Sequence, residues 1–131
     1  MCYWQNIANI SISGLESSTF SDKVTSKADN TSDSGPLTIS SKTDRVYTPA
    51  GGSAAAVIVS EGGKKKYEVV RDNLNQVVVW NPWTDAKEIG DWKPVEGYKE
   101  MICVEAGAVK GWLSLEAGET WEGGVQVLVA N

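Results

Sequence analysis

The stretch Met101-Ile-Cys-Val-Glu-Ala-Gly107 decides the fold. It is short, apolar and closed by a glycine, which is typical of a β-strand. Similar runs recur at residues 10–12, 57–59, 67–71, 77–80 and 125–129, each bounded by Gly, Asn, Asp or Ser. Short strands separated by turns, with no long helical periodicity, predict an all-β fold, an antiparallel β-sandwich or barrel.

Three segments interrupt this pattern. Residues 25–36 are polar and rich in Ser, Asp, Asn and Lys, which predicts a mobile loop. Residues 61–66 place two glycines before three lysines and predict a hairpin turn with a solvated basic tip. Residues 84–97 predict short helical and irregular turns around Pro94.

The composition indicates one domain, residues 1–131, with 41% hydrophobic residues. Its formal net charge of -5 argues against nucleic acid as a partner, because binding to phosphate backbones requires positive charge. No stretch reaches the roughly 20 apolar residues of a membrane span, and the N-terminus does not resemble a signal peptide. We therefore expect a cytoplasmic protein, with an organelle such as a plastid as the alternative.

The two cysteines, Cys2 and Cys103, show no metal-ligand spacing. The sequence predicts two reduced thiols, with Cys103 in the core. We predict no metal and no organic cofactor, since no cluster of ligand residues is visible.

Glu105 is the first candidate for chemistry, because a carboxylate among Ile102, Cys103 and Val104 is costly to desolvate unless it is paired or used. The chain contains no histidine, the commonest general acid or base at neutral pH. The alternative for Glu105 is a buried structural carboxylate that accepts hydrogen bonds from backbone amides.

Five separated motifs follow one another in a recognisable order. They are Gly14-Leu-Glu16 with Asp22-Lys23, Thr43-Asp-Arg-Val-Tyr47, Val78-Val-Trp-Asn-Pro-Trp83, the Glu105 strand, and Leu115-Glu-Ala-Gly-Glu-Thr-Trp121. Together they resemble the C-terminal half of the hexose-6-phosphate 1-epimerases, the glucose-6-phosphate mutarotase branch of the aldose-1-epimerase superfamily. The resemblance implies an antiparallel β-sandwich that forms part of a galactose mutarotase-like supersandwich.

The resemblance also implies roles for two residues. Glu105 corresponds to the family's catalytic base, and Asp44 to an aspartate that orients the sugar. For Asp44 the alternative is a turn cap that pairs with Arg45 or another surface base. Asp22 and Lys23 are expected to form an ion pair at a strand end.

The family's acid is a histidine that would fall at or before Met1-Cys2, where this chain has none. A hexose-6-phosphate 1-epimerase activity is therefore expected to be incomplete unless another segment, a lysine or a tyrosine supplies the acid. The alternative is a noncatalytic carbohydrate-binding or assembly module. The six tryptophans suit either function, since indole rings both fill cores and stack on sugars.

Because the first half of the sandwich has no counterpart in this sequence, an unpaired strand edge and an apolar face are expected. This predicts a protein partner or a second copy that covers them, beside a hexose phosphate or other sugar as the small-molecule partner.

Overall fold

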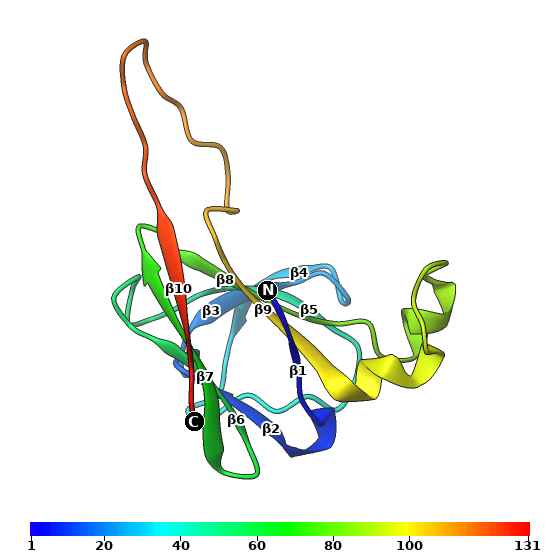
Figure 1. Ribbon diagram of the computed structural model, residues 1–131. Helices are drawn as coiled ribbons and strands as arrows, with labels where there is room; N and C mark the ends of the chain where they lie inside the picture. The colour runs from blue at the N-terminus through cyan, green and yellow to red at the C-terminus, as the bar shows by residue number, and fades with distance from the viewer.

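The computed structural model describes all 131 residues and has two antiparallel sheets packed face to face (Figure 1). In spatial order, the six-stranded sheet contains β1 (Cys2–Trp4), β9 (Met101–Gly107), β8 (Gln76–Asn81), β5 (Thr43–Thr48), β3 (Thr19–Asp22) and β4 (Lys27–Thr31). The four-stranded sheet contains β10 (Gly124–Val129), β7 (Lys64–Asp72), β6 (Val57–Glu61) and β2 (Ile10–Ser13). The prediction of an antiparallel β-sandwich is confirmed.

All six predicted runs lie in strands, namely β2, β6, β7, β8, β9 and β10. The prediction of a mobile loop at residues 25–36 is wrong, because this segment contains β4, which pairs with β3. Most side chains of β4 are exposed, so the strand lacks the apolar alternation that reveals a strand in a sequence.

The connections between strands are formed by glycine turns and short helices. The predicted hairpin joins β6 to β7 through Gly62 and Gly63, whose φ angles are 58° and 78°. The segment before β9 forms two short 3-10 helices, η2 (Trp83–Glu88) and η3 (Val95–Glu100), as the sequence predicts. A third, η1 (Ile7–Asn9), links β1 to β2.

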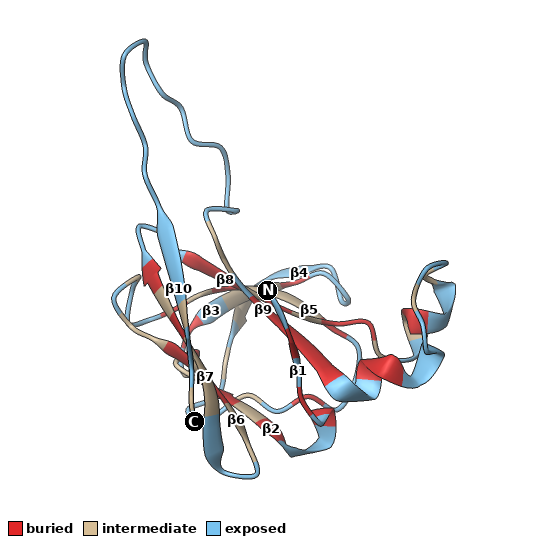
Figure 2. Cartoon of the chain, viewed as in Figure 1, coloured by how far each residue is buried: buried red, intermediate tan, exposed pale blue.

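The core lies between the two sheets, where Figure 2 shows most of the buried segments. Period-two alternation along β9 directs Ile102 and Val104 into this core. Met101, Cys103 and Glu105 therefore project from the opposite side of the six-stranded sheet. We call this side, which points away from the four-stranded sheet, the outer face.

The Gly14-Leu-Glu16 motif is structural. Gly14 has a φ of 95°, and a Cβ there would lie 2.3 Å from the Ala56 carbonyl oxygen, so only glycine fits. Leu15 is buried in the core, and the Glu16 carboxylate accepts a hydrogen bond of 2.7 Å from the Gly14 amide.

Asp22 also has a structural role, although the predicted pair with Lys23 is wrong. Its carboxylate accepts a hydrogen bond of 2.8 Å from the Val24 amide and pairs with Arg45 at 3.2 Å. The register of β3 against β5 places Asp22 directly opposite Arg45, which explains this choice of partner.

Residues 108–123 form an excursion that extends far from the two sheets before returning as β10 (Figures 1 and 2). Trp112, Leu113 and Leu115 are exposed there, and the exposed fraction of Trp112 is 102%. β10 pairs with β7 along one edge only, so its other edge carries unpaired backbone groups. None of the helices has the length and apolar character that crossing a membrane would require.

Candidate functional site

The outer face brings Glu105 and Asp44 to the same side of the six-stranded sheet. Trp80 on β8 lies opposite Asp44 on β5 and opposite Cys103 on β9. Directly opposed residues of antiparallel strands project to the same face, so these three share the outer face. Glu105 follows Cys103 by two residues on β9 and joins them.

The two carboxylates lie on either side of β8: Asp44 is in the same cross-strand row as Trp80, and Glu105 is in the next row. They are separated by two strand spacings and one two-residue step, which places their Cα atoms about 12 Å apart. Both side chains can lean toward the space between them.

The Glu105 carboxylate is exposed, and it has no hydrogen bond or ion pair. The alternative of a buried carboxylate held by backbone amides is therefore wrong. The apolar neighbours that suggested burial, Ile102 and Val104, point to the opposite side of β9. A carboxylate oxygen of Glu105 and the two cysteine sulfurs lie within 4.8 Å of one another, so the side chain turns toward the Trp80 row.

Asp44 is half-buried and does not pair with Arg45, which binds Asp22 instead. Its backbone oxygen accepts a hydrogen bond of 2.9 Å from the Lys23 amide. The side chain has no hydrogen-bond partner in the chain and stays available to a ligand. The pKa of Lys42 is raised by its hydrogen bond to Asp85 and, to a smaller extent, by the nearby charge of Asp44.

The six tryptophans divide into three groups. Trp4, Trp80 and Trp92 line one pocket, which we call the tryptophan pocket. Trp83 packs against the core and Tyr98, with ring centroids 5.4 Å apart. Trp112 and Trp121 lie on the excursion.

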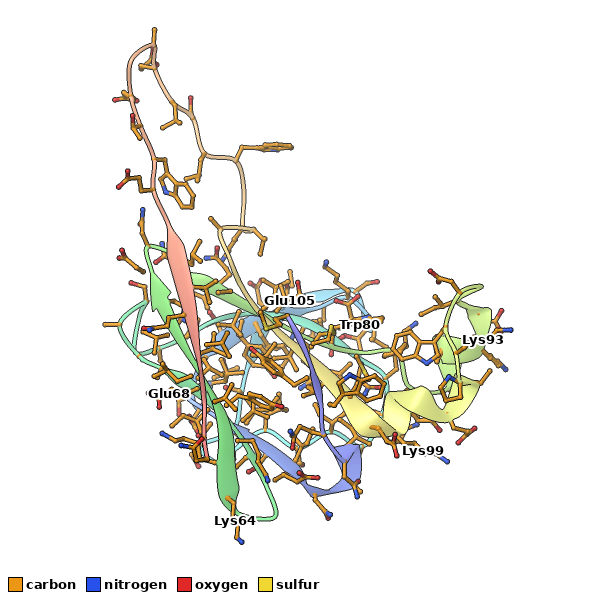
Figure 3. All side chains as sticks on the ribbon, in the orientation of Figure 1. Lys64, Glu68, Trp80, Lys93, Lys99 and Glu105 are labelled. Carbon is orange, nitrogen blue, oxygen red and sulfur yellow. A yellow bond between two sulfur atoms is a disulfide. The ribbon has the colours of Figure 1, made fainter.

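The tryptophan pocket has a volume of about 290 Å³ and lies at the end of the outer face where η3 meets β9. Trp80 and Trp92 meet edge to face, with centroids 6.0 Å apart and planes at 74°. Asp91 and Lys93 supply its charged groups. In Figure 3, Trp80 lies between Glu105 and Lys93.

A second hollow, of about 430 Å³, lies on the other side of the Glu105 row. Val78, the cross-strand partner of Glu105, forms part of its wall. Its polar lining includes Lys23, Lys110 and Asp29. Glu105 is therefore located between two hollows, although it lines neither.

None of the four tyrosine side chains is exposed. Tyr3 and Tyr47 belong to the core cluster, Tyr67 packs against it, and Tyr98 is buried beside Trp83. Burial raises the pKa of Tyr3, and the nearby Tyr67 raises it further. The burial of the tyrosines argues against one of them as the acid for a sugar beside Glu105.

Cys2 and Cys103 form a disulfide, so the prediction of two reduced thiols is wrong. The two residues are 101 apart in sequence, but the pairing of β1 with β9 places them directly opposite each other on the outer face. Cys103 is buried, but it lies on the outer face and outside the core cluster in which the sequence predicted it. The sulfurs and Glu105 are close enough to share a metal ion, but sulfurs that are bonded to each other offer no thiolate.

Asn81 holds the tryptophan-bearing segment against the sheet. Its side chain is fully buried, and its Nδ2 donates to the Tyr98 and Met101 carbonyl oxygens at 2.8 and 2.9 Å. Its Oδ1 accepts a hydrogen bond of 2.8 Å from the Trp83 amide. One amide thereby joins the end of β8, the start of η2 and the start of β9.

The sequence of nearly the whole chain, residues 4–128, matches the family model described as aldose 1-epimerase. The chain belongs to the aldose 1-epimerase family. A protein from Cenchrus ciliaris, named as a candidate glucose-6-phosphate 1-epimerase, is 34% identical to this family member over 119 residues, or 90% of the chain. A protein of Salmonella typhimurium with the same name is 36% identical over 101 residues, or 76% of the chain.

Two solved structures share the fold of this epimerase-family chain. A structure titled as a candidate mutarotase from Salmonella typhimurium aligns with a TM-score of 0.67 and 30% identity, over 80% of this chain and 35% of that one. The structure of HI1317 aligns with a TM-score of 0.73 and 20% identity, over 96% of this chain and 42% of that one. The chain spans about a third of the length of its curated relatives, 35% and 33% in the two cases above.

Sequence reasoning left the tryptophans of this pocket undivided between pocket and core, and it missed the charged residues Asp91 and Lys93 in this aldose 1-epimerase relative. Trp4 and Trp92 come from segments 88 residues apart; the pairing of β1 with β9 places Trp4, and the segment between η2 and η3 places Trp92. The high tryptophan content was the available signal, but it could not separate pocket residues from core residues.

Proposed function

We propose that this chain carries the base and the substrate-orienting carboxylate of a hexose-6-phosphate 1-epimerase, an isomerase that interconverts the α and β anomers of a hexose 6-phosphate. The observation that supports this is the position of two unpaired carboxylates, Glu105 and Asp44, on either side of β8 on one face of a sheet. The names of the relatives point to the same reaction.

In this reaction Glu105 accepts the proton of the anomeric hydroxyl while an acid protonates the ring oxygen. The bond between the anomeric carbon and the ring oxygen breaks, and the anomeric carbon becomes an aldehyde. Rotation about the neighbouring carbon–carbon bond exposes its other face. Reclosure returns both protons and yields the opposite anomer. Asp44 accepts hydrogen bonds from sugar hydroxyls and fixes the orientation of the ring.

The acid is the missing component. The chain has no histidine, and none of its four tyrosine side chains is exposed. We therefore propose that the acid is either a lysine beside the outer face or a residue of a second polypeptide segment. The residue of the second segment would raise the rate of anomer exchange more. This chain alone is therefore expected to be an incomplete epimerase.

The second segment would also cover the exposed apolar surface. The excursion presents Trp112, Leu113 and Leu115 to water, and β10 has an open edge. We propose that both are covered by polypeptide of the kind that forms the remaining length of the relatives, whether it belongs to the same or to a separate chain. Light scattering and dye binding test this, because a monodisperse monomer at high concentration that binds no hydrophobic dye would contradict it.

The second candidate function is a noncatalytic carbohydrate-binding or assembly module. One observation favours it: the Glu105 carboxylate lies within 4.8 Å of a disulfide and across the sheet from Val78, and neither of these can donate a proton to a sugar. Such a module would bind the sugar with Asp44 and the tryptophans but leave the anomers unchanged.

Anomer exchange of glucose 6-phosphate separates the two candidates. We expect Glu105→Gln to slow exchange by about 100- to 10,000-fold, since it removes the general base and keeps the shape of the side chain. Glu122→Gln, at an exposed position outside the outer face, is the matched control and should leave the rate unchanged. In a preparation that exchanges the anomers faster than the uncatalysed reaction, equal rates for the wild type and Glu105→Gln would remove Glu105 from the mechanism.

The proposal includes a location inside the cell, in the cytoplasm or in an organelle such as a plastid, because a phosphorylated sugar does not cross membranes unaided. The disulfide between Cys2 and Cys103 is more common in oxidising compartments. Cell fractionation with thiol trapping tests both points, and recovery of the protein only outside the cell would contradict the proposed location.

A further inference from the structure

Three groups that can bind a metal ion gather on the outer face, from Cys2, Cys103 and Glu105. The two sulfurs and a carboxylate oxygen lie within 4.8 Å of one another. The strand register explains this, because Cys2 lies directly opposite Cys103 on the neighbouring strand and Glu105 follows Cys103 by two residues. The backbone of two paired strands therefore holds all three groups on one side of the sheet.

The disulfide decides whether the two sulfurs can act as ligands. Cys103 is buried, but Cys2 is exposed on a three-residue strand at the edge of the sheet, so a reductant can reach the bond from this side. Exposed disulfides are the labile ones in a reducing compartment. A dithiol transfers two electrons and two protons to the S–S bond, becomes a cyclic disulfide itself, and leaves Cys2 and Cys103 as thiols.

The spacing of the three groups suits a tetrahedral ion once the S–S bond is broken. The Val104 amide donates to the Met1 carbonyl oxygen at 3.0 Å, so Cys2 and Cys103 form the next, non-hydrogen-bonded pair, in which side chains lie closest. A tetrahedral zinc ion keeps sulfur and oxygen ligands about 3.5–3.8 Å apart. After reduction, rotation of the two side chains can open the sulfurs to this spacing, and the Glu105 oxygen is already in range.

We infer that the reduced form of this chain binds a zinc ion through the Cys2 and Cys103 thiolates and the Glu105 carboxylate, with water as the fourth ligand. Two thiolates favour Zn²⁺ over Mg²⁺ and Ca²⁺, which prefer oxygen ligands. The ion replaces the two thiol protons, which pass to solvent. Because Cys2 and Glu105 are exposed, the fourth position is open to water.

Zinc at this site occupies the carboxylate to which the proposed function gives the role of base. A carboxylate bound to a cation cannot accept the proton of a sugar hydroxyl. The zinc-bound form is therefore inactive as an epimerase, and oxidation to the disulfide releases the ion. Only this consequence rests on the proposed function, since the metal site depends on the positions of the three ligands alone.

Titration with Co²⁺ tests the site, because this ion occupies zinc sites and its bonds to thiolates absorb in the near ultraviolet. The full chain is reduced with dithiothreitol, freed of reductant by anaerobic gel filtration and titrated with Co²⁺, and Zn²⁺ is then added in competition. We expect the reduced wild type to bind one ion with thiolate absorption, Zn²⁺ to displace it, and the oxidised wild type to show no such absorption. Absence of the absorption in the reduced wild type, or equal absorption before and after reduction, overturns the inference.

Variants of the ligands separate this site from a pair of thiols that binds metal by itself. Cys2→Ser should weaken Zn²⁺ binding by more than about 100-fold, since the loss of a group that only supports a ligand already costs about 10- to 100-fold. Glu105→Gln should weaken it by at least about 10-fold, because an uncharged amide is a poorer ligand. Glu122→Gln, at an exposed position outside the outer face, is the matched control and should leave the affinity unchanged.

The Glu105 variant also guards against a trivial result. A reduced chain that had lost its fold could still bind metal through its two thiols, but it would do so without Glu105. If reduced Glu105→Gln binds Zn²⁺ as tightly as the reduced wild type, the three-ligand site is wrong and the inference is overturned.

The failure of the zinc site and the failure of the proposed function give different results. In a preparation that exchanges the anomers of glucose 6-phosphate faster than the uncatalysed reaction, Zn²⁺ should stop exchange by the reduced wild type but not by Cys2→Ser. If Zn²⁺ binding depends on Cys2 and Glu105 while exchange continues, the zinc site stands and the proposed base is wrong. If exchange depends on Glu105 while the reduced chain binds no Co²⁺, the zinc site is wrong and the epimerase proposal stands.

Discussion

Replacing Asn81 with alanine removes the amide that fastens the segment of residues 83–100 to the sheet. The side chain is fully buried and makes three hydrogen bonds to the backbone, two from its Nδ2 and one to its Oδ1, beside a contact of 3.4 Å from Nδ2 to the Met101 sulfur. A neutral hydrogen bond contributes about 0.5–1.5 kcal/mol net, so the three together contribute about 3 kcal/mol. The carbonyl oxygens of Tyr98 and Met101 and the Trp83 amide lose this partner in the variant.

Urea unfolding followed by tryptophan fluorescence measures this loss. With a slope typical of a domain of this size, about 3 kcal/mol lowers the urea midpoint by about 1–2 M. Asn75→Ala is the matched control, because Asn75 precedes the same strand, is exposed and makes no side-chain hydrogen bond; it should change stability by less than about 0.5 kcal/mol. A loss below about 1 kcal/mol for Asn81→Ala would refute the reasoning that this amide holds the segment.

Three further perturbations test other parts of the structure. Reduction of the Cys2–Cys103 disulfide should lower the free energy of unfolding by up to about 4.7 kcal/mol, because the bond closes a loop of about 100 residues. The stability of the Cys2→Ser variant should not respond to reductant. An equal urea midpoint for the wild type with and without reductant would contradict the bond. Gly14→Ala should lower the free energy of unfolding, measured by heat or urea, by about 2–4 kcal/mol, since the φ of Gly14 is 95° and the new Cβ would meet the Ala56 carbonyl oxygen. Gly35→Ala is the control and should be nearly neutral, because the space around Gly35 is open. Similar losses for both variants would count against the close approach at Gly14. Burial raises the pKa of Tyr47, so the phenol ionises in the unfolded state at a lower pH than in the folded state. The contribution of Tyr47 to the free energy of unfolding should therefore be fully present below about pH 10 and fall above it. Tyr47→Phe should show a shallower fall of stability with pH, and parallel curves of stability against pH for the wild type and the variant would oppose this assignment.

The sequence predicted the strands that bury one side. In β8, Val77 and Val79 alternate with outward residues, and this pattern alone locates the strand. In β4, nearly all side chains face water, and the strand forms because its backbone completes the pairing of β3. A strand of this kind has no periodic signal.

The site was predictable in its residues but not in its surroundings. Asp44 and Glu105 were chosen from motifs that resemble a family, and the register of β5, β8 and β9 then places them on one face. The exposure of Glu105 depends on which side of β9 is covered, which its neighbours in sequence do not reveal. Likewise, the Cys2–Cys103 disulfide and the tryptophan pocket depend on contacts between distant segments.

The pairing of β1 with β9 has a consequence for how the molecule forms. Tyr3 faces Ile102 across this ladder, so β1 cannot find this neighbour until about 100 further residues have been synthesised. Ladders between such distant segments close slowly, and until then β1 is free to pair with other strands. The face that carries Glu105 is therefore completed only after β9 has been synthesised.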